Sequence, residues 1–284
     1  MLKLGYLGPE GTFSEKAAHI WLHWVRGTSW LGEGRTGIPQ LFHELEAGEL
    51  HQIVVPVENS IEGAVNVTQD YLIRIEDIEI LGEISLSIEH YLATSQRIPL
   101  SEISAVYSHP QALSQCHEYL QNNLKHASLL QATSTAEAAR LVAQNAPGIA
   151  AVTSKDAVIK YGLTVLAEKI QDFSDNKTRF WVLGKKEGKE AIPKNNNSSL
   201  KTSIVVALPY NRPGSLYEIL KGFADANLDL TRIESRPTKK ELGEYLFIID
   251  FWGHLQDKTV LDTLTKLKTK AAMLKILGSY PIIT

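Results

Sequence analysis

The turn at residues 8–14 combines small polar side chains with an acid directly after an apolar run, and it opens a helical pattern. It reads Gly8-Pro9-Glu10-Gly11-Thr12-Phe13-Ser14. Backbone N–H groups at the start of a helix, together with the helix dipole, attract anions such as a carboxylate. Capping of the helix by Thr12 or Ser14 explains the same residues about equally well. The turn therefore predicts an anion site or an ordinary cap.

A second segment, Val55-Pro56-Val57-Glu58-Asn59-Ser60-Ile61-Glu62-Gly63, places an acid, an amide and a hydroxyl between an apolar strand and another helix. Glu58 in this position is suited to act as a general acid or an orienting group. Capping by Asn59 or Ser60, with Glu58 simply in solvent, is an equally good interpretation.

The third segment contains Ser108, His109 and Gln111, with Pro110 in the first turn of a helix. A Ser-His catalytic pair is one interpretation, but neighbours in sequence do not make a triad. The Gly-x-Ser-x-Gly turn of serine hydrolases is absent from the sequence. A structural or ligand-binding histidine is therefore favoured.

The fourth segment runs from Asp172 to Phe180 and ends in a Thr-Arg pair beside an aromatic ring. Arginine recognises carboxylates and also stacks on rings, so this combination suits an anionic, ring-containing substrate. The alternative is a polar loop that closes the domain, with Arg179 in an ion pair.

Short apolar runs alternate with helical patterns over residues 1–184, which predicts α/β layering with largely parallel strands. The expected strands are Lys3–Leu7, Ile53–Val57, Ile78–Leu92, Ala105–Tyr107, Ala150–Val152 and Arg179–Leu183. Ligands of open α/β sheets bind at the carboxyl ends of strands. Polar turns that follow several of these strands therefore predict one shared cleft.

Residues 185–199 replace hydrophobic periodicity with charge, proline and an Asn-Ser run, which predicts a linker. Residues 200–284 then predict a βαββαβ, ferredoxin-like unit. Pro213 is expected in the first turn of its first helix, and Asn227 at the left-handed end of that helix. The expected elements are strand 202–208, helix 213–226, strands 229–236 and 244–253, helix 257–269 and strand 274–280.

Composition limits the classes of partner. With 29 basic and 32 acidic residues the net charge is -3, which gives no excess positive charge for nucleic acid. Cys116 is the single cysteine, so neither an intramolecular disulfide nor a zinc-type cysteine pair can form, as suits a reducing cytosol. A Gly-Pro turn follows seven residues after the start, and no apolar run reaches the length of about 18 that a membrane span needs. We expect a cytoplasmic protein that contacts neither nucleic acid nor membrane.

Taken together, the motifs resemble those of the prephenate dehydratase family, in the same order along essentially the whole chain. The matching segments are Gly8–Ser14, Pro56–Ser60, Ser108–Leu113, Ser134-Thr135-Ala136-Glu137-Ala138-Ala139 and the Asp-x-x-x-Asn-x-Thr-Arg-Phe stretch at 172–180. The resemblance implies a catalytic region at 1–184 with two α/β lobes, built like type 2 periplasmic binding proteins. Lobe one is expected at 1–80 plus 167–184, lobe two at 81–166, and the active site between them.

The family's reaction removes water and carbon dioxide from prephenate to give phenylpyruvate in phenylalanine biosynthesis, without a cofactor; no metal site is expected. By the family motif, Thr178 donates to or orients the departing hydroxyl, with Arg179 and Phe180 positioning the site. Glu58 supplies a proton if burial raises its pKa. The residues expected to bind substrate are Gly11, Thr12, Phe13, Asn59, Ser60, Ser108, His109, Gln111, Gln115 and Ser134.

Residues 200–284 resemble an ACT domain, a module that binds amino acids at subunit interfaces. The resemblance implies feedback by L-phenylalanine and a homodimer or homotetramer. The expected effector residues are Asn211, Pro213, Gly214, Ser215 and Leu216, with Glu234, Ser235 and Arg236. Ser215 stands where the family's motif usually has alanine.

Two other functions fit the sequence. Arogenate dehydratase acts on a substrate with an amine in place of the ketone, and the motifs do not separate the two enzymes. A non-catalytic amino-acid-sensing or solute-binding protein would share the two-lobed fold, since fold does not fix function; the Thr178-Arg179-Phe180 stretch argues against it. With the first strand expected at Lys3, no room is expected for a fused chorismate mutase.

Overall fold

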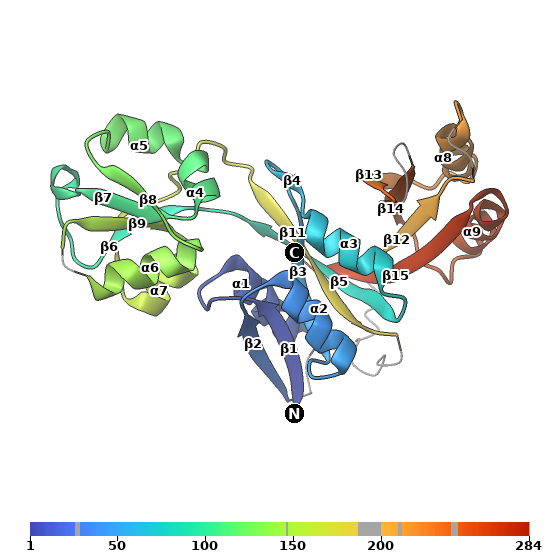
Figure 1. Cartoon of the computed structure of the whole chain (residues 1–284), viewed down its shortest axis with the longest axis horizontal. Coiled ribbons are helices and arrows are strands. Elements are labelled where there is room, and N and C mark those ends of the chain that lie inside the picture. The colour runs from blue at the N-terminus through green and yellow to red at the C-terminus, as the bar shows by residue number, and fades with distance from the viewer. Residues whose placement is uncertain (26–28, 146, 187–199, 210–211, 240–243, 284) are drawn as a thin grey trace. The chain divides into compact units, whose positions relative to one another are not determined.

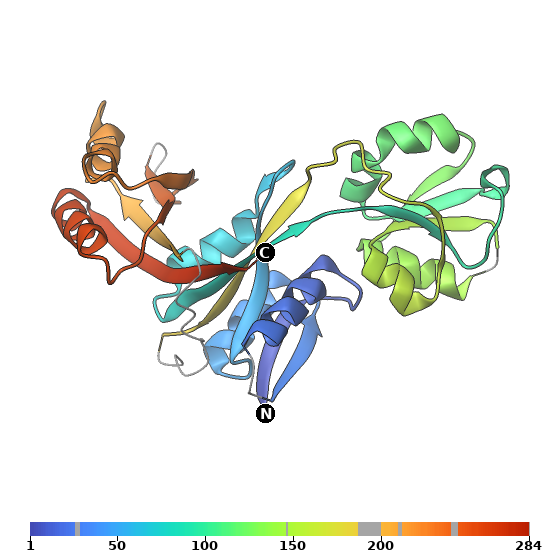
Figure 2. The same cartoon turned by 180° about the vertical axis from the view of Figure 1, so that it is seen from behind.

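The computed structural model describes residues 1–25, 29–145, 147–186, 200–209, 212–239 and 244–283 (Figures 1 and 2). Two compact units form: residues 1–68 with 84–180, and residues 69–83 with 181–284. The expected linker at 185–199 lies outside the described residues from 187 onward. No helix among the described residues is long and apolar enough to cross a bilayer.

The first sheet of the first unit contains β1 (Leu2–Leu7), which pairs in parallel with β2 (Trp30–Arg35) and β3 (Gln52–Asn59). Helix α1 (Phe13–Trp24) follows β1, and α2 (Ile38–Ala47) follows β2. Buried side chains of the helices, such as Trp21 and Phe42, join strand residues such as Ile53 in the core. Beside β3 lies the start of β11 (Lys177–Lys185), where Ser60 N donates to Lys177 O over 2.8 Å.

The second sheet has the strand order β10-β6-β9-β7-β8, covered by helices on both faces (Figure 1). Its strands are β6 (Tyr91–Thr94), β7 (Ala105–Ser108), β8 (Ser128–Gln131), β9 (Ile149–Thr153) and β10 (Thr164–Ala167). Alternate residues of β9 serve two cores: Ala150 and Val152 pack with α4 (Pro110–Gln115) and α5 (His117–Asn123), while Ala151 packs with α6 (Thr135–Gln144) and α7 (Lys155–Tyr161). This alternation is the pleat of a strand that is buried on both faces.

Three expectations for residues 1–184 need correction. The run at 78–92 is not one strand: β5 (Ile78–Ser87) ends three residues before β6 begins. A short strand, β4 (Gly63–Ala64), pairs antiparallel with β3 before α3 (Asn66–Arg74), where a helix alone was expected. The second sheet also contains antiparallel pairs where largely parallel strands were expected, since β6 runs antiparallel to β9 and β10.

The second unit confirms the predicted βαββαβ order. Its elements are β12 (Leu200–Ala207), α8 (Ser215–Asp225), β13 (Leu230–Pro237), β14 (Tyr245–Trp252), α9 (Lys258–Lys270) and β15 (Met273–Ile283). Both helices pack on one face of the sheet, around Ile204, Phe223, Phe251 and Leu264. Asn227 is left-handed, with φ 54°, as predicted. The prediction for Pro213 was wrong, because the helix begins at Ser215 behind a left-handed Gly214.

The sheet of the second unit continues onto β5 in the order β13-β14-β12-β15-β5. A Cβ at Gly278 would stand 2.4 Å from Ile80 O, so the close approach of β15 to β5 requires glycine. Lys201 Nζ meets Glu83 Oε1 at 2.8 Å in a buried ion pair. Lys275 Nζ donates to three carbonyls at the C-terminal end of α3, those of Leu72, Ile73 and Ile75. Burial lowers the pKa of Lys275. Residues 69–83 are thereby tied to residues 200–283.

Candidate active site

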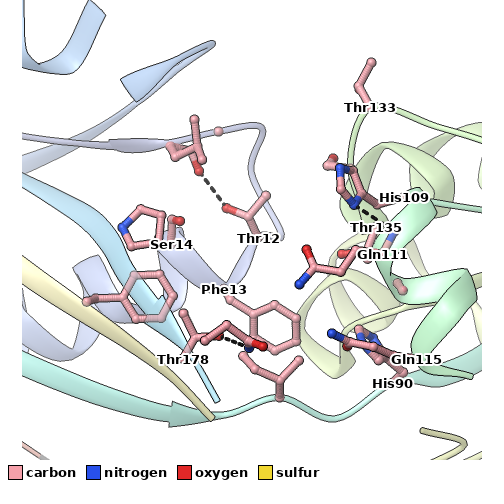
Figure 3. Close-up of a pocket in the computed structure, with 18 of the residues that line it drawn as sticks. Thr12, Phe13, Ser14, His90, His109, Gln111, Gln115, Thr133, Thr135 and Thr178 are labelled. Carbon is pink, nitrogen blue, oxygen red and sulfur yellow. Dashed lines mark hydrogen bonds between the residues drawn. The ribbon is translucent and has the colours of Figure 1, made fainter. Parts of the chain in front are cut away.

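A pocket of about 400 Å³ opens in the first unit, lined by side chains from the elements of both sheets. Figure 3 shows Thr12, Ser14 and Thr178 on one side and His109, Gln111 and Gln115 facing them from the other. Nine of the predicted site residues line this pocket: Thr12, Phe13, Asn59, His109, Gln111, Gln115, Ser134, Thr178 and Phe180. Segments that lie far apart in the sequence thus share one site, as the polar turns predicted.

The two strand residues Thr178 and Phe180 line the pocket, whereas Arg179 between them does not. Successive side chains of a strand point to opposite faces, so Arg179 is directed away from the pocket. Arg179 instead forms an ion pair with Glu58, with 2.8 Å between Arg179 Nη1 and Glu58 Oε2. Glu58 does not line the pocket either. The ion-pair alternative for Arg179 is therefore confirmed.

Three further predicted residues do not line the pocket but form hydrogen bonds that join the segments around it. Gly11 accepts a hydrogen bond from Ser154 Oγ over 2.9 Å, and with φ 86° it packs against Ala157. Ser60 Oγ accepts from Lys177 N over 2.9 Å. Ser108, fully buried, donates to Val152 O over 2.6 Å and joins β7 to β9.

Capping explains part of the polar content of these turns. Thr12 Oγ1 accepts from Glu15 N, and Ser134 Oγ accepts from Glu137 N, so these residues cap α1 and α6. His109 Nδ1 accepts from Gln111 N over 3.3 Å and caps α4, while Ser108 is bonded elsewhere, so the two do not form a catalytic pair. All three caps also line the pocket.

The lining carries no lysine, arginine, aspartate or glutamate among the described residues; His90 and His109 are its ionisable side chains. An anionic ligand in the pocket would therefore be stabilised by hydrogen bonds from neutral donors. These are the first backbone N–H groups of α1 and α6 together with hydroxyl, amide and imidazole side chains.

A hydrogen-bond network runs from Thr178 through Asn59 and Asn176 to Gln115. Asn59 Nδ2 donates to Thr178 Oγ1 over 2.9 Å and to Asn176 Oδ1 over 2.8 Å. Asn176 Nδ2 donates to Gln115 Oε1 over 3.0 Å. Because Thr178 Oγ1 accepts from Asn59, its own proton is available to a ligand. Thr178 is thus set up as a donor into the pocket.

Sequence reasoning missed two members of this network, Asn176 and His90. Asn176 is a fixed position of the motif at 172–180 and is 1% exposed, but the motif did not identify it as a site residue. His90 is 3% exposed and lies 3.1 Å from Gln115 Oε1 through its Nε2. Burial lowers its pKa, and the hydrogen bond with Gln115 opposes this in part.

The fold and the pocket define a two-lobed α/β protein with a pocket of neutral donors and a C-terminal ferredoxin-like module. Residues 4–188 match the family model described as prephenate dehydratase, and residues 202–269 match that of the ACT domain. The chain belongs to the prephenate dehydratase family.

Relatives of nearly the same length support this assignment. A prephenate dehydratase of Methanocaldococcus jannaschii is 41% identical over 98% of this chain and 97% of its own. One from Bacillus subtilis is 35% identical over 98% of each chain. The crystal structure of an Arthrobacter aurescens prephenate dehydratase in complex with L-Phe superposes with a TM-score of 0.84 at 34% identity, covering 99% of this chain and 90% of that one. The predicted fold class is confirmed by the same likeness.

Proposed function

We propose that the chain converts prephenate to phenylpyruvate, water and carbon dioxide. In this reaction the bond from the ring to its carboxylate breaks, and its electron pair enters the ring as the C–O bond to the ring hydroxyl breaks. The departing hydroxide takes up one proton and leaves as water. The observation that carries the proposal is the Thr178 hydroxyl, which accepts from Asn59 and so presents its proton to the pocket.

The neutral lining suits this substrate. Prephenate has two carboxylates, one of which must leave as uncharged carbon dioxide. A lysine or arginine against that carboxylate would stabilise the charged ground state more than the transition state. Helix starts and amide donors can hold the second carboxylate while leaving the first free to lose its charge.

Glu58 tests whether the ion pair beside the pocket supports catalysis. We expect Glu58→Gln to lower kcat far more than it raises KM, because glutamine cannot balance the Arg179 charge 2.8 Å away on the strand that carries Thr178. Steady-state kinetics with prephenate measures both constants, and exposed Glu62→Gln serves as the control. Near-normal turnover in Glu58→Gln would remove Glu58 from the mechanism.

The second unit supports a proposal of feedback by L-phenylalanine, since the Arthrobacter aurescens relative was crystallised with that amino acid. Gly214 and Ser215 lie at the start of α8, and Glu234, Ser235 and Arg236 lie on β13. Pro213 and Leu216 flank the same turn, while Asn211 lies outside the described residues. A homodimer or homotetramer and a cytoplasmic location belong to the same proposal. Cys116, the single cysteine, is free and buried.

Gly214 offers the sharpest test of the effector site. Its φ of 90° is strained for any L side chain and most for a β-branched one. We expect Gly214→Val to weaken L-phenylalanine binding by at least about tenfold, measured by calorimetry. Leu261→Ala, an exposed position on α9 outside both motifs, is the control and should bind normally. Unchanged binding in Gly214→Val would place the effector elsewhere.

A further inference from the structure

His90 lies in the short connection between β5 and β6 and belongs to none of the motifs found in the sequence. Its ring is buried, and the edge contact with Phe13 places the ring centroids 6.3 Å apart at 80°. Both rings line the pocket. A buried histidine at a pocket wall needs a defined tautomer, since each ring nitrogen either donates or accepts.

The hydrogen bonds of the described residues fix that tautomer step by step. Backbone N–H groups can only donate, and those of Ile61 and Glu62 lie 3.0 and 3.1 Å from Asn59 Oδ1. This identifies the oxygen of the Asn59 amide. Its Nδ2 therefore donates to Asn176, and the oxygen of Asn176 faces Asn59.

The same logic extends to the far side of the pocket. With its oxygen turned to Asn59, Asn176 directs its Nδ2 at Gln115, so the Gln115 atom 3.0 Å away is the oxygen. That oxygen also lies 3.1 Å from His90 Nε2. An amide oxygen has no proton to give, so His90 Nε2 carries it.

The side-chain oxygen of Gln115 thus accepts from both Asn176 Nδ2 and His90 Nε2. Gln115 Nε2 has no hydrogen-bond partner among the described residues, although the side chain is only 6% exposed. A buried amide nitrogen without a partner is costly unless a ligand supplies the acceptor. Gln115 lines the pocket, and a substrate oxygen would complete its hydrogen bonds.

We propose that His90 is a positioning residue which, as the Nε2–H tautomer, locks the Gln115 amide so that its two N–H donors face the substrate. This rests on the proposed function, because the substrate must bring the oxygen that Gln115 binds. Burial agrees with this role, since it lowers the pKa of His90 and keeps the ring neutral. In this tautomer Nδ1, which has no partner among the described residues, is an acceptor.

The test uses four variants of the full chain assayed with prephenate: His90→Phe, His90→Gln, Gln115→Leu and the double variant Gln115→Leu/His90→Phe. His90→Phe keeps the ring and its contact with Phe13 but removes the donor, and we expect kcat/KM to fall about tenfold to thirtyfold. His90→Gln can place an amide N–H near the former Nε2 and should recover most of that loss. In a Gln115→Leu background, His90→Phe should change kcat/KM less than twofold, because the group it positions is already gone.

The proposal would be overturned if His90→Phe lowered kcat/KM by the same factor in the Gln115→Leu background as in the unsubstituted enzyme. Normal activity of His90→Phe would also overturn it. NMR of the unsubstituted protein with ¹⁵N-labelled histidine gives a second readout that needs no variant to fold. It should show His90 protonated at Nε2, and a proton at Nδ1 would overturn the proposal even if the enzyme is active. If the protein does not consume prephenate, the proposed function is wrong. The NMR spectrum would still show which ring nitrogen of His90 carries the proton.

Discussion

Thr178→Val is expected to lower kcat about 10²- to 10³-fold while KM changes far less. Valine keeps the shape of threonine but removes the hydroxyl that accepts from Asn59 and donates into the pocket. Loss of one donor to developing negative charge in an enzyme site has an effect of this size. Because the departing hydroxide gains charge only in the transition state, the loss should appear in kcat and not in KM. Steady-state kinetics with prephenate measures both.

Thr178→Ser is the matched control, since serine keeps the hydroxyl and loses only the methyl group. It should retain most of the activity. Thermal melting of both variants shows whether the fold is intact. If Thr178→Val turns over prephenate as the unsubstituted enzyme does, the hydroxyl has no part in the chemistry.

Asn59→Asp is the second substitution with a large expected effect, at least about 10²-fold on kcat. The side chains are nearly the same size, but the donor that faces Thr178 becomes an acceptor. The Thr178 proton would then turn toward residue 59 and away from the substrate. A carboxylate at this 8% exposed position would also repel the two carboxylates of prephenate.

The same kinetic assay measures this variant, with Glu62→Gln on the exposed part of the same turn as the control. A circular dichroism melt separates loss of the fold from loss of chemistry. Retained kcat in folded Asn59→Asp would mean that the direction of the Asn59–Thr178 hydrogen bond does not matter.

The C-terminal module was predictable because its elements carry strong periodic patterns. Apolar residues recur along α8 and α9, and the strands between them are apolar where they face these helices, as at Ile204 and Phe251. The exact start of α8 was not predictable, since it depends on the left-handed Gly214. A proline before a helix gives the same local pattern whether it lies inside the first turn or just outside it.

Strands of the first unit were missed where their burial is incomplete. All four residues of β8 (Ser128–Gln131) are exposed, so no apolar alternation marks it. Strand β2 (Trp30–Arg35) contains Gly32 and Gly34, which usually signal turns. Both strands lie at sheet edges and are held by pairing with a neighbour that the local sequence does not reveal.

For the site, the sequence indicated which turns meet but not how each side chain is directed. Thr178 and Arg179 are neighbours in one motif, yet the pleat of β11 turns only Thr178 to the pocket. His90 acts on a residue 25 positions away, and Asn59 on one 119 positions away. Such partners are defined by the folded chain, so a histidine without a motif gave no signal.

The most direct test of the central claim is the formation of phenylpyruvate by the purified protein, followed by its absorbance with prephenate as substrate and arogenate in parallel. We predict phenylpyruvate from prephenate at a rate that Thr178→Val reduces about 10²- to 10³-fold. The parallel assay shows whether the pocket distinguishes the ketone of prephenate from the amine of arogenate. Absence of phenylpyruvate above the uncatalysed rate, or a rate unaffected by Thr178→Val, would contradict the account.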